Sequence, residues 1–178
     1  MIRPTSVILA VALTSCSAYR AVDEALDAWP RYDIPGSKAS VALPMAPVFA
    51  DETFATRLCD DLVRTSFSVH AKFGQYSGYF VALQPHCSAN PSNAAALELL
   101  VAPQAGPEWQ PVAWRQVNSI NGHPGHETRF RRLANPLMIR TVQTFIIDAG
   151  VLAVVAEGKD NIIAAEDAQK FFRWVNTR

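Results

Sequence analysis

The stretch Ile120-Asn-Gly-His-Pro-Gly-His-Glu-Thr-Arg-Phe130 decides the interpretation of the fold, because two strand-like segments meet at it. It contains two glycines and a proline within four positions, a composition that marks a tight turn. Asn121 and Gly122 both tolerate the positive φ that such a turn requires. We therefore expect a β-hairpin, in which residues 112–119 enter the turn and residues 125–133 leave it.

Alternation of apolar and polar residues predicts further strands on both sides of this hairpin. The expected strands cover residues 38–43, 64–71, 79–83, 136–147 and 151–156. Residues 45–50 and 73–78 have the composition of a loop and a turn, and residues 53–63 fit a helix or a twisted strand.

The run Val151-Leu-Ala-Val-Val-Ala156 is apolar at every position, which is typical of a strand buried on both faces. Gly150, in the short loop before this run, stands where a hairpin needs positive φ.

Two segments have helical patterns. Residues 90–103 begin with Asn90-Pro91, an N-cap residue followed by proline at the first helical position, and end at Pro103. In residues 164–175 the apolar side chains recur at helical spacing and the charged ones face away. The order strands, helix, strands, helix predicts an α+β fold, in which helices pack on an antiparallel sheet.

The first 15 residues have the pattern of a secretory signal peptide, which is not part of the fold. A short positive segment with Arg3 precedes the apolar run Val7-Ile-Leu-Ala-Val-Ala-Leu13. As a helix this run would be about 10 Å long, a third of the thickness of a bilayer core, so it cannot span a membrane.

The sequence Leu13-Thr14-Ser15-Cys16 resembles the lipobox of bacterial lipoproteins, in which a hydrophobic residue and two small ones precede an invariant cysteine. The resemblance implies that Cys16 is acylated with diacylglycerol and becomes the mature N-terminus. Residues 16–37 would then tether one domain, residues 38–178, to the periplasmic side of a bacterial membrane. Ser17 favours the outer over the inner membrane, since aspartate there favours inner-membrane retention in enteric-type lipoproteins. The alternative is an ordinary signal peptide with a chance cysteine.

Two further cysteines, Cys59 and Cys87, remain after Cys16 is assigned. In an oxidising periplasm an even remainder favours a disulfide. Two buried free thiols are the alternative, because a bridge also requires the two residues to lie close in space.

The hairpin motif Asn-Gly-x-Pro-Gly-x-Glu, the long hairpin after it and a final amphipathic helix with Phe171-Phe172 resemble the Mog1/PsbP-like fold. Bacterial lipoproteins of the DcrB type share this fold. The resemblance covers roughly residues 38–175 and is best over residues 120–175. It implies an α-β-α sandwich, with a central antiparallel sheet flanked by helices, and a binding or assembly role without a shared active site.

The histidines of the turn are the first candidates for chemistry. His123 and His126 flank Pro124-Gly125, and two histidines three apart could bind Zn²⁺ or Cu²⁺ with a further donor. The spacing assures no third donor, so we assign neither a metal nor another cofactor. A plain polar turn and contact with another ligand both remain open.

Glu127, Arg129 and Arg131 fall on one face of the outgoing strand. A glutamate beside arginines is usually a surface ion pair, and the alternative is an anion-binding ledge formed by the arginines. We take His123, His126, Glu127 and Arg129 as candidate ligand-binding residues.

Several aromatic residues lie in or near the predicted loops. If they cluster at one end of the sheet, they form a binding surface. If they face the sheet, they belong to the core. They are Phe73, Tyr76, Tyr79, Trp109 and Trp114. Trp114 lies on an alternating strand, so we expect it in the core.

The 178 residues include 16 basic and 16 acidic ones without a basic stripe, so we expect no nucleic-acid partner. The sequence contains no Gly-x-Ser-x-Gly, Walker, Gly-x-Gly-x-x-Gly or His-Glu-x-x-His motif, and we assign no catalytic residues. We therefore expect a non-enzymatic envelope lipoprotein that binds or supports a partner, a protein rather than a small ligand. The alternative is a metal-binding protein or hydrolase that uses the His123/His126 turn.

Overall fold

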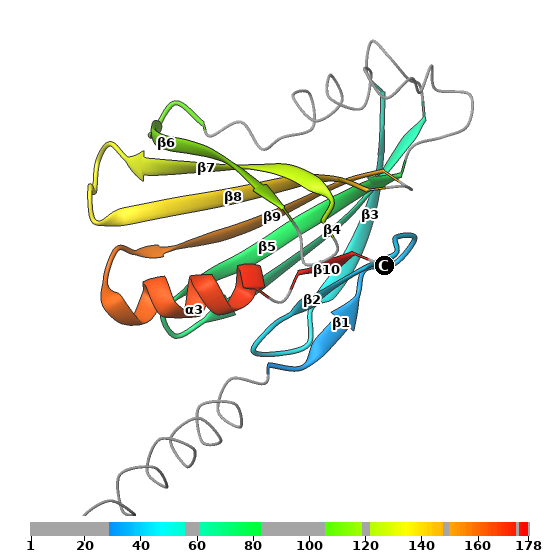
Figure 1. The fold of residues 1–178 in the computed structure, drawn as a ribbon, viewed down its shortest axis with the longest axis horizontal. Coiled ribbons are helices and arrows are strands. Elements are labelled where there is room, and N and C mark those ends of the chain that lie inside the picture. Colours follow the sequence, from blue (N-terminus) through cyan, green and yellow to red (C-terminus); the bar gives the residue numbers. More distant parts are fainter. Residues whose placement is uncertain are drawn as a thin grey trace, which may run out of the picture.

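The structure, a computed structural model, describes residues 29–55, 61–82, 106–118, 122–147, 150–173 and 175–177. Its largest element is a seven-stranded sheet with the strand order β3-β4-β5-β9-β8-β7-β6 (Figure 1). The strands are β3 (Val48–Phe54), β4 (Leu62–Ala71), β5 (Gly74–Ala82), β6 (Trp109–Asn118), β7 (Pro124–Arg132), β8 (Met138–Ile147) and β9 (Gly150–Lys159).

The sheet consists of two antiparallel meanders that join at one strand pair. Strands β3, β4 and β5 form the first meander, and β6 to β9 form the second. They meet where β5 pairs with β9, from Gly74 opposite Gly158 to Ala82 opposite Gly150. β9 is therefore the central strand, and residues 151–156 are all buried. The prediction of a strand buried on both faces is confirmed.

A second layer covers one face of the sheet, which we call the helix face. It contains α3 (Ile162–Arg173) and a small sheet of β1 (Arg31–Asp33), β2 (Ala39–Ala42) and β10 (Asn176–Thr177). Together they close a single apolar core with the large sheet (Figure 1). The largest fully buried side chains of that core are Ile34, Val41, Leu43, Tyr76, Phe80, Phe145, Leu152 and Phe171.

The expected α-β-α sandwich is wrong, because the fold is mostly β and helices do not flank the sheet on both sides. In the described ranges the sole helix is α3, and it packs on one face. The rest of that cover is β structure: all four residues of β2 are buried, and they pair with β1 and β10. β1 lies within residues 16–37, the range predicted to be a tether. The helix expected at residues 90–103 lies outside the described residues.

Strands β3 and β5 include residues that were expected to form a loop and a turn. β3 starts at Val48, within the expected loop, and β5 starts at Gly74, within the expected turn. In β5, Gln75 and Ser77 pair with His70 and Ser68 on the face opposite the helix. The polar side chains on this partly solvated face explain why the sequence of the segment has the composition of a turn.

The two turn glycines have different roles. Gly122 has φ of 80°, as the sequence predicted for the hairpin turn. Gly150 is not among the described residues with positive φ. Glycine is needed there instead because a Cβ would clash with the Val81 carbonyl oxygen, where β9 begins beside the end of β5.

The opposite face of the sheet has a smaller apolar cluster of Leu62, Tyr79, Val81, Val151 and Ala153. Burial raises the pKa of the Tyr79 phenol, and the charge of Arg64 lowers it by a smaller amount. No described residue provides a hydrogen-bond partner for the Tyr79 hydroxyl. Burial likewise raises the pKa of Tyr76 on the helix face, with a further contribution from Asp167.

Tyr79→Phe should leave the free energy of unfolding at pH 7 unchanged or raise it by up to about 1 kcal/mol, because it removes a buried hydroxyl without a described partner. In the wild type, stability should fall above pH 10.0, the ordinary tyrosine value, since the unfolded chain then loses protons that the folded chain retains. The slope should reach about 1.4 kcal/mol per pH unit for each buried tyrosine, so Tyr79→Phe should flatten it.

Urea unfolding between pH 7 and pH 11 measures both effects, and partly exposed Tyr32→Phe is the control. A loss of more than about 1 kcal/mol at pH 7 in Tyr79→Phe would show that the hydroxyl is bonded in the folded state.

Candidate functional site

A groove of about 680 Å³ lies on the helix face, between α3 and the second meander. We call it the helix groove. On the sheet side it is lined by Arg115, Val117, Glu127, Arg129, Thr141 and Gln143. On the helix side it is lined by Asp160, Ala165, Ala168, Gln169, Phe172 and Arg173. The volume is within the range of about 300–1,000 Å³ that is usual for ligand pockets.

The strand register brings the polar side chains of the helix groove together. Arg115 of β6 is directly opposite Glu127 of β7, which is directly opposite Gln143 of β8. Residues directly opposite one another in a sheet project to the same face. These three side chains therefore form a row across the floor of the groove.

Glu127 is the centre of this row, and only 6% of it is exposed. Arg115 Nε donates a hydrogen bond to Glu127 Oε1 at 2.8 Å, and Arg115 Nη2 donates to Oε2 at 3.0 Å. Gln143 Nε2 donates to Oε2 at 2.6 Å. A buried carboxylate is costly unless it is paired and hydrogen-bonded, and here it has both kinds of partner.

Arg115 differs from Glu127 because its side chain is 66% exposed. The hydrogen bonds to Glu127, and then the charge of Glu127, raise the pKa of Arg115. A guanidinium group has five N–H donors, and the bidentate pair uses two of them. Glu127 thus fixes the plane of the guanidinium, and no hydrogen bond to another described residue uses its three remaining donors.

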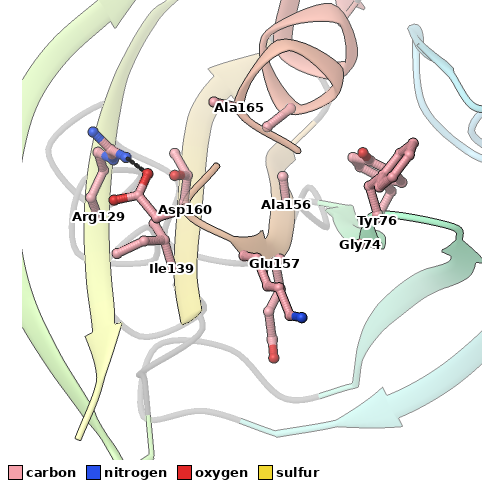
Figure 2. Close-up of a pocket in the computed structure, with 13 residues that line it drawn as sticks. Gly74, Tyr76, Arg129, Ile139, Ala156, Glu157, Asp160 and Ala165 are labelled. Carbon is pink, nitrogen blue, oxygen red and sulfur yellow. Dashed lines mark ion pairs between the residues drawn. The ribbon is translucent and has the colours of Figure 1, made fainter. Parts of the chain in front are cut away.

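Arg129 and Asp160 lie farther along the groove. Figure 2 shows their side chains directed toward one another, with 3.8 Å between Arg129 Nη2 and Asp160 Oδ1. Beyond them a narrow hollow of about 40 Å³ continues between the sheet and α3, past Ile139 and Ala165.

The structure separates the four residues that the sequence proposed as one ligand site. Glu127 and Arg129 line the helix groove. His126 pairs with Thr144 in the register and lies on the opposite face, where its ring stacks on Trp114 at 5.3 Å. His123 precedes β7 and is partly exposed. The described part of the chain holds no group of three His, Cys, Asp or Glu residues that could bind a metal ion.

The expectation that Trp114 belongs to the core is wrong, since it is 62% exposed. It lies on β6, which forms the edge of the sheet, on the face opposite α3. The candidate aromatic surface does not form either, because Tyr76, Tyr79 and Trp109 are buried.

Sequence reasoning missed Arg115, Gln143, Asp160 and Arg173, and it treated Glu127 as a surface residue. The predicted hairpin could have indicated Arg115, because the register of a hairpin decides which residues are opposite one another. A hairpin centred on position 121 places Arg115 and Glu127 six residues from its centre on either side, and the structure pairs them directly. No local pattern indicates Gln143, Asp160 and Arg173, because their place in the groove depends on how distant strands and α3 pack together.

The residues that carry the anchoring and disulfide predictions, Cys16, Cys59 and Cys87, lie outside the described residues. Among the helices that the structure describes, none has the length and apolar character needed to cross a membrane.

Comparison with known proteins finds no protein-family model that matches the chain and no curated protein that matches it.

A double-mutant cycle on Arg115→Ala and Glu127→Ala should give a coupling energy of about 1–3 kcal/mol, because the carboxylate is buried and bound by two N–H groups. Glu52 and Arg64 provide a matched control, since they are also directly opposite across two strands but have side chains 59% and 37% exposed. Their coupling should be below about 1 kcal/mol. Equal coupling energies in urea unfolding would contradict the special role of Glu127.

Proposed function

We propose that the protein is a lipid-anchored binding protein of a bacterial cell envelope, without catalytic activity. Its helix groove would receive an acidic segment of a partner protein. The observation that carries this proposal is the buried Glu127, which holds the exposed guanidinium of Arg115 in one orientation.

The charges of the groove favour an anionic occupant. Its lining includes three arginines, Arg115, Arg129 and Arg173, and two acidic residues, Glu127 and Asp160. Glu127 is already bound to Arg115 and Gln143, so it offers little to a cationic ligand. Arginine binds carboxylates in a planar, bidentate manner. A ligand with carboxylate groups would therefore complement the groove.

The shape of the groove favours a chain segment over a compact small molecule. α3 has 12 residues, so the wall it forms is about 18 Å long. About five residues of an extended peptide would span that length. In the described part of the chain β6 pairs with β7 alone, which leaves the groove open at the edge of the sheet. Ala165, Ala168 and Phe172 give its helix wall an apolar strip for the side chains of the peptide.

The anchor would be the acylated Cys16, with the protein on the periplasmic side of the membrane and the outer membrane favoured by Ser17. Cys16→Ala should abolish incorporation of radioactive palmitate in growing cells, because the thiol is the acceptor of the lipid. Cys59→Ala is the matched control and should keep the label. Continued labelling of Cys16→Ala would contradict the anchor.

A photo-crosslinking residue in place of Gln169, an exposed residue of the groove wall, should give a discrete crosslink to one envelope protein in cells. Arg115→Ala combined with Arg129→Ala should reduce that crosslink by at least about tenfold, since each lost charge-assisted hydrogen bond contributes about 1.5–3 kcal/mol.

The control position for this experiment is Thr53, an exposed residue on the far edge strand β3. The same partner captured equally well from Thr53, or captured from Gln169 without any effect of the arginine substitutions, would contradict binding in the groove.

A further inference from the structure

The β7–β8 turn exposes two large apolar side chains at one end of the sheet. Leu133 is 62% exposed and Leu137 is 64% exposed. Residues 131–137 are all exposed, and Figure 1 shows the turn between β7 and β8 at one end of the sheet. Single exposed leucines are common on protein surfaces, but two on one short turn form a local apolar tip.

Backbone hydrogen bonds hold this tip in place on both sides. The N–H of Leu133 donates to the Glu108 carbonyl at 2.8 Å, just before β6. The N–H of Asp160 donates to the Leu137 carbonyl at 2.6 Å, just after β9. The N–H of Met138 also closes the turn onto the Asn135 carbonyl at 2.9 Å. The exposure of the leucines is therefore built into the fold.

Basic residues surround the apolar tip. Arg131 and Arg132 directly precede it, and Arg132 is further held over the ring of Trp109 at 6.0 Å. Lys159 is opposite Met138 in the register, so it lies at the same end of the sheet. From the level of Arg131 outward, this end of the sheet bears four basic residues, Lys72, Arg131, Arg132 and Lys159, and two acidic ones, Glu108 and Asp160.

The chain enters the fold at the same end. Trp29, the first described residue, packs on Tyr76 of β5 with 5.2 Å between ring centroids. Tyr76 is opposite Ala156, three residues before the end of β9 at Lys159. Three strand spacings, about 14 Å, separate β5 from β7. Trp29 is thirteen positions after Cys16, and a fully extended chain of that length reaches at most about 45 Å.

We propose that the tip of Leu133 and Leu137, with its surrounding basic residues, is a membrane-contact surface that inserts into the headgroup region of an anionic lipid leaflet. The proposal rests on the lipid anchor proposed above, because that anchor would keep the domain within reach of the bilayer. Apolar side chains ringed by basic ones match the two parts of such a leaflet, its acyl boundary and its phosphates. The helix groove would then lie above the membrane and remain accessible to a partner.

The test uses the acylated full-length protein in vesicles of phosphatidylethanolamine and phosphatidylglycerol. A diazirine-bearing residue replaces Leu137, and lipid adducts of the protein are counted by mass spectrometry after illumination. The control carries the same residue at Thr53, exposed at the other end of the sheet. We expect at least tenfold more lipid adducts at Leu137 than at Thr53.

Charge is tested in the same assay. Arg131→Gln with Arg132→Gln should lower the adduct yield at Leu137 about tenfold or more, because each arginine near an anionic surface contributes about 1 kcal/mol. Arg64→Gln, at the other end of the sheet, should leave it unchanged within about twofold. Vesicles of phosphatidylcholine alone carry no net negative charge. With them, the yield of lipid adducts at Leu137 in the otherwise unchanged protein should fall as far as it does with the arginine substitutions.

Lipid adducts at Leu137 and acylation of Cys16 are measured separately, so the membrane-contact surface and the anchor can fail independently. Acylated Cys16 without lipid adducts at Leu137, or with equal adducts at Leu137 and Thr53, would overturn the membrane-contact surface and leave the anchor intact. Adducts specific to Leu137 when unacylated protein is mixed with vesicles would support the surface even if Cys16 carried no lipid.

Discussion

The pairing of β5 with β9 is the constraint on which the rest of the structure depends. It joins two meanders that are otherwise local in sequence, and it places the apolar residues 151–156 at the centre of the sheet. Such a strand must be covered on both faces to remove its side chains from water. On the helix face α3 and β2 provide that cover, with Phe171 packed on Tyr76 at 5.2 Å between ring centroids.

The candidate site follows from where this cover ends. α3 lies along the centre of the sheet, whereas the second meander extends two strands beyond β8 to the edge (Figure 1). In that outer part the row Arg115, Glu127 and Gln143 takes the place of apolar residues on the helix face. A buried ion pair is weak evidence for stability, and its value here lies in the fixed orientation of Arg115. The fold therefore supplies both the groove and the rigid donor at its floor.

Sequence patterns predicted the strands with clear alternation or continuous apolar runs, namely the hairpin around residues 120–130 and the strand at residues 151–156. They failed where position in the sheet overrides local pattern. Trp114 alternates like a core residue but lies on an edge strand, beyond any described cover, and β2 joins a separate small sheet through the distant β10. The burial of Glu127 could not be predicted, because it depends on Gln143 and on the position of α3 as well as on Arg115.

Arginine side-chain NMR tests most directly whether Arg115 is held by Glu127 to bind carboxylates. Each arginine Nε–H gives a separate ¹⁵N signal, and hexaglutamate serves as a defined acidic probe. Saturable shifts of Arg115, Arg129 and Arg173 are predicted, with Arg64 and Arg140 unchanged, since these two pair with Glu52 and Glu157 outside the groove. Unchanged signals for Arg115, or equal shifts for all arginines, would contradict a carboxylate site in the helix groove.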